Sequence, residues 1–284
     1  MLRSSVYQTL YAPEGLRISD PAYSAAGCKT RAVIHHVAVP DPIFADPRLA
    51  RLYDVVDDDR SDLDVYAGII DELKATSVLD VGCGTGTLAC RLAQRRIEVF
   101  GLDPAAALLD VARCKPGAEH VRWIHGDASS TPPLDVDLAI MTGNVAQVFV
   151  TDGDWSRALD AIRRAVQGRG WLVFETRDSA QRAWERWTRE HTYREIDVPD
   201  AGPVRTWTEL IDVQEPFVSF RHVFRFPEDG SQLVSVSTLR FRDRDEIAES
   251  LHAAGFQLHA VRDAPDRPGL EFVFLAQRKE APQW

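Results

Sequence analysis

Cysteine, methionine and positive charge are scarce in this sequence. The few cysteines argue against a disulfide scaffold, and the low positive charge argues against a nucleic-acid-binding protein. The four cysteines form no C-x-x-C pair and no regular framework, which indicates reduced thiols rather than a disulfide scaffold. Acidic residues outnumber basic ones by 43 to 33, giving a net charge of −10. Because phosphate binding needs a surplus of Lys and Arg on one face, no nucleic-acid partner is expected.

Long apolar runs and metal-ligand patterns are missing as well. No run approaches the ~20 residues that cross a bilayer, and no hydrophobic signal segment follows Met1. The eight histidines are scattered and none forms H-x-x-x-H, so no metal site is expected. We therefore expect a cytoplasmic protein with no membrane partner and no metal, whose 284 residues can bury a full core.

One glycine-rich stretch stands out from this ordinary background. Residues 78–81 are mostly apolar and β-branched, which predicts a buried parallel strand, and the glycines that follow predict a tight turn opening a helix at Thr87. Glycine allows backbone conformations that side chains forbid, and it lets a ligand lie against the main chain. The helix directs unpaired N–H groups toward the turn. We expect a small ligand with an anionic or carbonyl-bearing group to bind here.

The spacing of the glycines separates the candidate cofactors. The nicotinamide and flavin fingerprint requires G-x-G-x-x-G, but the third glycine, Gly86, comes one position too early. The pattern present is acidic-x-Gly-x-Gly-x-Gly, in which Asp80 precedes Gly82, Gly84 and Gly86. With the strand before it, this pattern closely resembles the first motif of class I S-adenosylmethionine-dependent methyltransferases. A glycine-rich turn that binds nothing is the alternative.

This resemblance, together with the alternation of strand and helix, predicts the fold. We expect an α/β protein built on a seven-stranded, mostly parallel, Rossmann-like methyltransferase sheet with helices on both faces and an antiparallel last strand. Residues 46–177 and 243–278 would form this core. Residues 178–242 would form an antiparallel β insertion after the fifth strand, a lid that shapes the acceptor pocket. Residues 1–45 are expected to be a poorly ordered extension.

Periodicity and turn signals place the individual elements. The expected helices cover residues 47–55, 61–74, 87–94, 155–167 and 244–254. The expected core strands cover residues 78–81, 98–103, 121–125, 136–141, 171–175, 256–261 and 270–276. In the insertion we expect strands over residues 204–213, 217–226 and 232–241, with a hairpin turn at 227–230.

Carboxylates at the ends of two later strands suit the same cofactor. Asp103 ends the second core strand, where one carboxylate can accept hydrogen bonds from both hydroxyls of a ribose; capping the helix at Pro104 is the alternative. The resemblance assigns Asp127 to the exocyclic amine of adenine, with the backbone of Ala128 nearby, and a plain Asx-turn competes with that role. The cofactor-binding residues that we expect are Asp80, Gly82, Cys83, Gly84, Gly86, Asp103, Pro104, Asp127, Ala128, Thr142 and Gly143.

Sequence patterns say less about the residues that would bind the methyl acceptor. In the family, the end of the fourth strand meets the methionine part of the cofactor and the acceptor. A helix before the glycine motif often covers the cofactor, so Tyr53 is either part of that cover or a core aromatic residue. The insertion could equally shape the acceptor pocket, form a dimer contact or pack as a structural sheet. The expected substrate-binding residues are Asn144, Gln147, Arg177, Trp207 and Arg221, and the candidate bases are His222 and Tyr53.

The resemblance implies methyl transfer from S-adenosylmethionine to an O or N atom of a small organic acceptor by in-line displacement. The sulfonium is already a strong electrophile, so the protein's main task would be alignment. Two alternatives remain. A non-catalytic S-adenosylmethionine-binding regulatory protein would share the cofactor residues, and a nicotinamide-dependent oxidoreductase would share the sheet. A small-molecule partner is expected, and a homodimer stays open.

Overall fold

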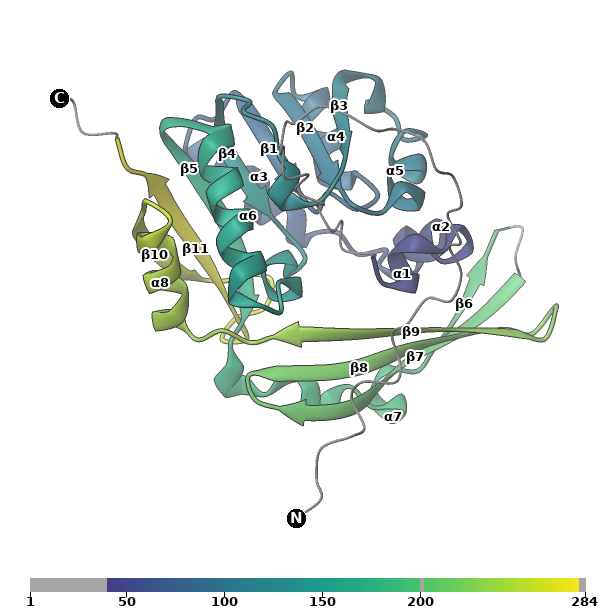
Figure 1. Ribbon diagram of the computed structural model, residues 1–284. Helices are drawn as coiled ribbons and strands as arrows, with labels where there is room; N and C mark the ends of the chain where they lie inside the picture. The colour runs from purple at the N-terminus through teal and green to yellow at the C-terminus, as the bar shows by residue number, and fades with distance from the viewer. Residues whose placement is uncertain (1–39, 200–201, 281–284) are drawn as a thin grey trace, which may run out of the picture. The chain divides into compact units, whose positions relative to one another are not determined.

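The computed structural model describes residues 40–199 and 202–280, which form two β-sheets and their covering helices (Figure 1). Most of the extension expected over residues 1–45 therefore lies outside the described residues. Within it, a short helix, α1, spans Pro42–Ala45 and begins with proline at its first position. No helix in the described ranges is long and apolar enough to cross a membrane.

The larger sheet has seven strands in the order β10-β11-β5-β4-β1-β2-β3. Neighbours from β5 to β3 pair in parallel, whereas β11 is antiparallel to both β5 and β10. The prediction of a mostly parallel seven-stranded sheet with an antiparallel last strand is confirmed. Its strands are β1 (Ser77–Val81), β2 (Glu98–Asp103), β3 (Val121–His125), β4 (Val136–Met141), β5 (Val166–Arg177), β10 (Phe256–Asp263) and β11 (Glu271–Arg278).

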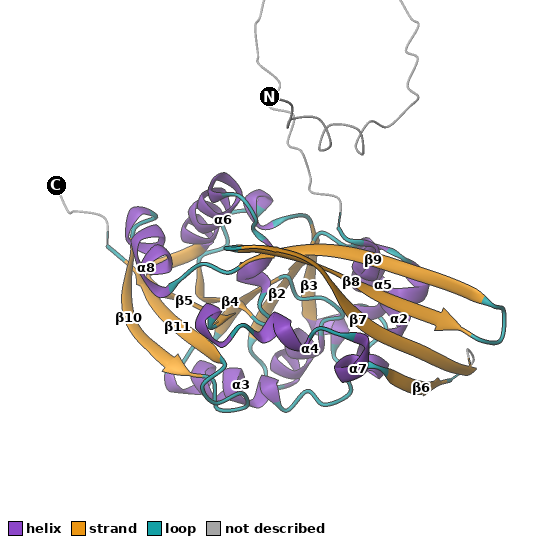
Figure 2. Ribbon diagram, turned by 90° about the horizontal axis from the view of Figure 1, so that it is seen from below, coloured by secondary structure: helices purple, strands orange, loops and turns teal. Residues whose placement is uncertain are grey.

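Helices cover both faces of this sheet because successive residues of each buried strand point to opposite faces. Leu79 and Phe174 share one face with α6 and α8, while Val78 and Val173 share the other with α3 and α4. Figure 2 shows α6 and α3 on opposite sides of the sheet. The helices are α2 (Pro47–Val56), α3 (Asp62–Glu72), α4 (Thr87–Gln94), α5 (Ala106–Ala112), α6 (Asp152–Ala165), α7 (Arg189–Thr192) and α8 (Arg244–Ala253).

The second sheet is antiparallel, in the order β6-β7-β8-β9, and confirms the predicted insertion after the fifth strand. One of its faces packs through Val204, Phe224 and Phe226 against Leu49 and Leu52 of α2. Helix α2 also packs against α5, so it lies between the second sheet and the core. The strands are β6 (Arg194–Val198), β7 (Gly202–Gln214), β8 (Phe217–Phe226) and β9 (Ser231–Arg240).

Several features differ from expectation. The structure contains strand β6, which is not predicted from the sequence. It is a short edge strand whose charged residues alternate with Ile196 and Val198, so its apolar signal is weak. Helix α6 begins earlier, at Asp152, where the Thr151 side chain accepts a hydrogen bond from the backbone N–H of Asp154. It also ends earlier, and β5 begins at once with residue 166. The domain boundaries themselves stay predictions.

Candidate functional site

The turn after β1 brings three left-handed glycines to the carboxyl edge of the sheet. The φ angles of Gly82, Gly84 and Gly86 are +72°, +56° and +71°. A Cβ at Gly86 would lie 2.4 Å from the indole of Trp123, so this glycine is required by packing. A Cβ at Gly84 would meet nothing within 4 Å, and the same holds for Gly143 after β4. These two glycines therefore border open space at neighbouring strand ends, as a ligand cradle requires.

Asp103 stands at the end of β2, beside this turn. Its Oδ2 accepts the backbone N–H of Gly84 at 2.8 Å, and its Oδ1 accepts that of Ala105 at 2.8 Å. Burial raises the pKa of Asp103, and the two backbone hydrogen bonds oppose that shift. Each carboxylate oxygen keeps a second lone pair, so the group can still accept hydrogen bonds from two hydroxyls. The carboxylate bonds to the N–H of Ala105, the residue before α5, and does not cap a helix at Pro104; it remains a candidate for the ribose.

Asp80 is a buried carboxylate directly before the glycine turn. Its side chain is almost fully buried, and its Oδ1 has no hydrogen-bond partner among the described residues. Burial raises the pKa of Asp80 to about 7; the charge of Asp103 acts in the same direction and that of Arg60 opposes it. Without a ligand, a proton or a cation is therefore favoured at this carboxylate.

This shift has a measurable effect on stability. Between about pH 4 and pH 7 the folded state holds a proton on Asp80 that the unfolded state has released, so the free energy of unfolding should fall as the pH rises through this range. Asp80→Asn removes that dependence. We expect the variant to gain about 1 to 3 kcal/mol over the parent at pH 8 and little near pH 4 in urea unfolding. A gain that is the same at both pH values would contradict the assignment.

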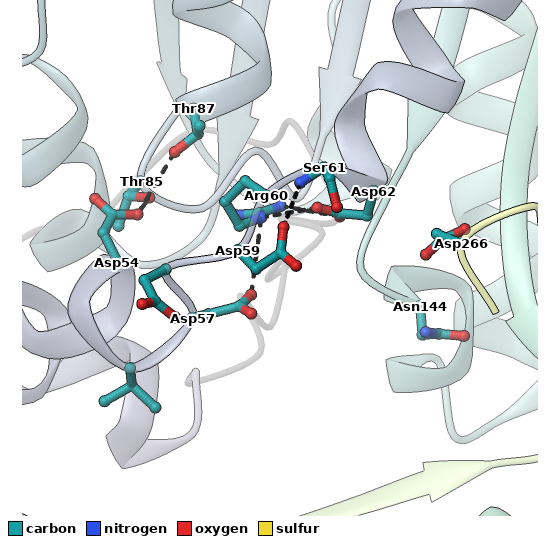
Figure 3. A network of polar contacts seen from close by, with 12 residues as sticks. Asp54, Asp57, Asp59, Arg60, Ser61, Asp62, Thr85, Thr87, Asn144 and Asp266 are labelled. Carbon is teal, nitrogen blue, oxygen red and sulfur yellow. Dashed lines mark hydrogen bonds and ion pairs between the residues drawn. The ribbon is translucent and has the colours of Figure 1, made fainter. Parts of the chain in front are cut away.

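A cluster of polar contacts holds α2 over the glycine turn (Figure 3). The Asp54 carboxylate accepts the Thr85 hydroxyl at 2.5 Å and lies 2.7 Å from the ammonium group of Lys115. Lys115 also donates to the hydroxyls of Thr85 and Thr87, at 2.9 and 2.6 Å. This arrangement places Tyr53, the preceding residue, near Asp103. Burial raises the pKa of the Tyr53 phenol, as do the nearby charges of Asp57, Asp103 and Asp54.

Lys115 is the centre of that cluster, which predicts a clear effect of removing it. Lys115→Met should lower the free energy of unfolding by about 1 to 2 kcal/mol, because three buried or half-buried oxygens lose a charged donor. Arg113→Met is the matched control, since Arg113, at the end of α5, makes an exposed pair with Asp110 and should change stability by less than about 0.5 kcal/mol. If Lys115→Met and Arg113→Met lost the same free energy of unfolding in urea, the contacts of Lys115 would contribute no more to stability than an exposed ion pair.

The expected adenine contact lies in a local turn. Asp127 caps a short 3₁₀ helix, Ala128–Ser130, and its Oδ1 accepts the Ser129 hydroxyl at 2.6 Å and the Ser130 N–H at 3.1 Å. The Asx-turn considered as the alternative is therefore present. Contact with adenine stays a prediction. The Oδ2 atom of Asp127 could accept a hydrogen bond from the adenine amine, and the buried Ala128 lies next to it.

The end of β4 carries the expected acceptor residues. Thr142, Asn144 and Gln147 are all buried, and Gln147 Oε1 accepts the Arg177 guanidinium at 2.9 Å. Asn144 has a φ of +61° and donates its backbone N–H to Glu175 at 3.0 Å. The structure therefore brings three of the five expected substrate residues, Asn144, Gln147 and Arg177, into one cluster.

The other two expected substrate residues are placed differently. In the β7–β8 register Thr208 pairs with His222, whereas Trp207 pairs with Val223, so the Trp207 side chain lies on the opposite face from His222. Arg221 shares that opposite face and bonds to Glu209. The structure thus separates Trp207 and Arg221 from the face of the sheet that packs on α2.

His222 lies on the face toward α2 and donates to or accepts from the Thr208 hydroxyl at 2.9 Å. Burial lowers the pKa of His222 to about 4, and the positive charge of Arg177 adds to this effect. The imidazole is therefore neutral near pH 7 and poorly matched to removing a proton from an acceptor. A role for His222 as the general base stays a prediction, and its lowered pKa argues against it.

Several polar residues near the site were not anticipated. Arg60, in the loop between α2 and α3, bonds to Asp62 at 3.2 Å and influences the pKa values of both Asp80 and Tyr53 (Figure 3). Glu175 and Glu271 are buried carboxylates at the ends of β5 and β11 that meet. A charged residue near the end of an apolar strand, as Glu175 is in β5, is the signal that could have revealed this buried carboxylate.

The strand order, the open glycine turn after β1 and the carboxylate ending β2 are the arrangement expected of the class I S-adenosylmethionine-dependent methyltransferase fold. A methyltransferase-domain family matches residues 78–170. Among the described residues no group of His, Cys, Asp and Glu could hold a metal ion.

Several known methyltransferases are similar to this chain. An uncharacterized methyltransferase of Mycobacterium tuberculosis is 36% identical over 149 residues, covering 51% of this chain and 55% of the relative. The chain thus spans about half the length of the curated relatives that it matches first. A methyltransferase structure from Clostridium acetobutylicum matches 82% of this chain and 98% of its own, with a TM-score of 0.64 and 16% identity.

A second solved structure contains the cofactor. It is the S-adenosylmethionine-bound CalS10 of Micromonospora echinaspora, an amino pentose methyltransferase. It covers 78% of this chain and 92% of its own, with a TM-score of 0.59 and 23% identity. At this identity the similarity establishes a shared fold.

Proposed function

We propose that this protein transfers a methyl group from S-adenosylmethionine to an O or N atom of a small organic acceptor. The observation that carries the proposal is the cradle: Gly84 and Gly143 border open space, and the buried Asp103 carboxylate lies beside it. A space free of side chains, next to a carboxylate that can accept two more hydrogen bonds, suits an adenosyl group.

Different residues would bind the cofactor, exclude water and close the acceptor side. Asp103 would orient the ribose, and Asp127 would accept from the adenine amine. Helix α2, held by Asp54 and Lys115, would cover the cofactor and exclude water. The bound cofactor supplies an electrophilic methyl group, so alignment by the protein can contribute several kcal/mol, on the order of what proximity effects supply. The second sheet would close the acceptor side through the face that bears His222.

Calorimetry tests the cofactor part of this proposal. We expect saturable binding of S-adenosylmethionine and of its demethylated product, S-adenosylhomocysteine, and no binding of NAD. The reason is that the third glycine of the turn is placed for the methyltransferase pattern and not for the dinucleotide pattern. Binding of NAD alone would instead support the oxidoreductase alternative.

Turnover separates an enzyme from a regulatory binding protein. Acceptors of several classes, including phenols, amines and carboxylic acids, are incubated with S-adenosylmethionine, and products are followed by their mass. The proposal expects a gain of one methyl group for at least one class. Tight cofactor binding without a methylated product from any class would favour a non-catalytic role.

A further inference from the structure

Two carboxylates are buried together at the edge where the parallel strands end. Glu175 and Glu271 are 4% and 3% exposed, and they project from the same face of the antiparallel pair β5–β11, where Val273 opposes Glu175 and Arg177 opposes Glu271. Burying a charge is costly unless it is paired. Glu271 has two cationic partners, Arg267 at 2.8 Å and Arg177 at 3.8 Å, whereas Glu175 makes no ion pair within the described residues.

Their hydrogen bonds are incomplete. Glu271 Oε1 accepts from Arg267 at 2.8 Å and from the Asn144 amide at 3.3 Å, and Glu175 accepts the Asn144 backbone N–H. Glu271 Oε2 and Asn144 Oδ1 are buried and have no partner within the described ranges. These two atoms are acceptors, so the group that would complete them is a hydrogen-bond donor; the buried amide Nε2 of Gln147, a donor, also has no partner within the described ranges.

The cluster adjoins the site proposed for methyl transfer. Asn144 follows Gly143, which borders the open cradle at the end of β4. Arg177 connects the cluster to Gln147 by a hydrogen bond, and the Tyr53 phenol and the two carboxylates all influence the pKa of Arg177. Arg177 in turn influences the pKa of His222 on the second sheet. The cluster therefore lies between the cofactor side and the second sheet, where the acceptor is expected.

We propose that the acceptor is an amine, held by Glu271 Oε2 and Asn144 Oδ1 and deprotonated by Glu175. This inference rests on the proposed methyl transfer and names its substrate class. The ammonium form of the acceptor gives one proton to the Glu175 carboxylate. The freed lone pair on nitrogen then forms the new C–N bond while the C–S bond breaks, and that bonding pair stays on sulfur.

The movement of charge explains why carboxylates suit this acceptor. When a neutral amine is methylated, positive charge passes from sulfur to nitrogen, and carboxylates on the acceptor side stabilise the charge that develops there. When an anionic oxygen attacks, the charges cancel, and the same carboxylates would repel the nucleophile. Arg267 and Arg177 offset part of this negative charge, but the unpartnered Glu271 Oε2 still favours a nitrogen acceptor that can donate to it over an anionic oxygen.

Glu175 also has surroundings suited to proton transfer. Burial and the charge of Glu271 raise the pKa of Glu175 to about 7, while hydrogen bonds from Asn144 and Gly143 and the charge of Arg267 oppose the shift. A base with a pKa near the working pH exchanges protons effectively. The charged and titratable groups that face it or adjoin the cluster are Glu271, Arg267, Arg177, Tyr53 and His222.

The test uses cofactor analogues, so that the acceptor need not be known. Sinefungin carries an amine where S-adenosylmethionine carries its methyl-bearing sulfonium, and S-adenosylhomocysteine carries neither charge at that position. Calorimetry should show that the protein binds sinefungin roughly ten- to hundredfold more tightly than S-adenosylhomocysteine, as expected for a charge-assisted hydrogen bond. Glu271→Gln and Glu175→Gln keep the shape of each side chain, and we expect each to remove most of that preference.

Two further variants make the result interpretable. Glu249→Gln changes an exposed carboxylate on α8 and should keep the full preference. Asn144→Gly suits the left-handed φ at this position and removes the unpartnered Oδ1, so it should reduce the preference even if a glutamate variant fails to fold. Thermal unfolding of each variant verifies its fold.

Each outcome decides the question. A preference that persists in folded Glu271→Gln, Glu175→Gln and Asn144→Gly, or is absent from the parent, would overturn the amine assignment. If Glu271→Gln weakens S-adenosylhomocysteine as much as sinefungin, the cluster binds the cofactor itself, and the assignment fails. If neither analogue binds the parent, the proposed function fails first and the inference fails with it.

Discussion

Gly86→Ala is expected to lower the free energy of unfolding by about 2 to 5 kcal/mol, because it combines backbone strain with a collision. The φ of +71° is costly for any residue with a Cβ, and the added carbon would lie 2.4 Å from Trp123 and 2.9 Å from the Cβ of Ala112. Trp123 cannot move aside easily, since its indole N–H donates to the Ala118 carbonyl at 3.1 Å and its ring packs over Gly101.

Gly84→Ala is the matched comparison. Its φ is +56°, so the strain is similar, but the new Cβ would meet nothing within 4 Å. We expect this variant to lose only about 1 kcal/mol of stability and to bind S-adenosylhomocysteine at least tenfold more weakly, because the Cβ would occupy the open cradle. Urea unfolding and calorimetry give the two quantities. Equal stability losses for both glycines, or unchanged cofactor affinity in Gly84→Ala, would contradict this division of roles.

The sequence predicts the core sheet well because its signals are local. The strands over residues 98–103, 121–125 and 136–141 and the helix over residues 87–94 have the bounds that the structure shows. The strands over residues 98–103 and 136–141 are compact and mostly apolar, because central strands of a parallel sheet are buried on both faces. Local pattern and tertiary environment agree here, so one can be inferred from the other.

Boundaries set by distant contacts are less predictable. The start of β5 is fixed by the pairing of Val166 with Val136, thirty residues earlier, so periodicity alone extends α6 too far. Strand β6 exists because Arg194 to Val198 pairs with β7, and its charged residues give little apolar signal. Such edge strands take their structure from a neighbour rather than from their own composition.

The site divides in the same way. The proposed cofactor half depends on a short motif, from Asp80 to Gly86, and on carboxylates at strand ends, which are readable along the chain. The proposed acceptor half would be assembled from Asn144, Glu175 and Glu271, which meet only because β11 inserts beside β5. No spacing in the sequence encodes that meeting. Along each strand of the insertion, successive side chains point to opposite faces of the sheet. Only the pairing of β7 with β8 shows that Trp207 and His222 lie on opposite faces.

Asp103→Ala should weaken the binding of S-adenosylhomocysteine by about 1 to 3 kcal/mol, which corresponds to roughly five- to 150-fold. The buried carboxylate would lose its hydrogen bonds to the ribose hydroxyls, and its removal would also free the N–H groups of Gly84 and Ala105. Because that second effect disturbs the turn without involving the ribose directly, the affinity loss alone does not prove ribose contact. Asp110→Ala, an exposed change on α5, serves as the control.

A cycle with a modified ligand separates the two effects. S-adenosylhomocysteine lacking the ribose 2′-hydroxyl removes the partner of the carboxylate while leaving the turn untouched. If Asp103 binds that hydroxyl, deleting both groups should cost less than the sum of the single deletions, with a coupling of about 1 kcal/mol or more. Strict additivity in calorimetry, with the Asp103→Ala protein folded, would place the ribose elsewhere. The carboxylate would then only shape the turn, as its bonds to Gly84 and Ala105 already do.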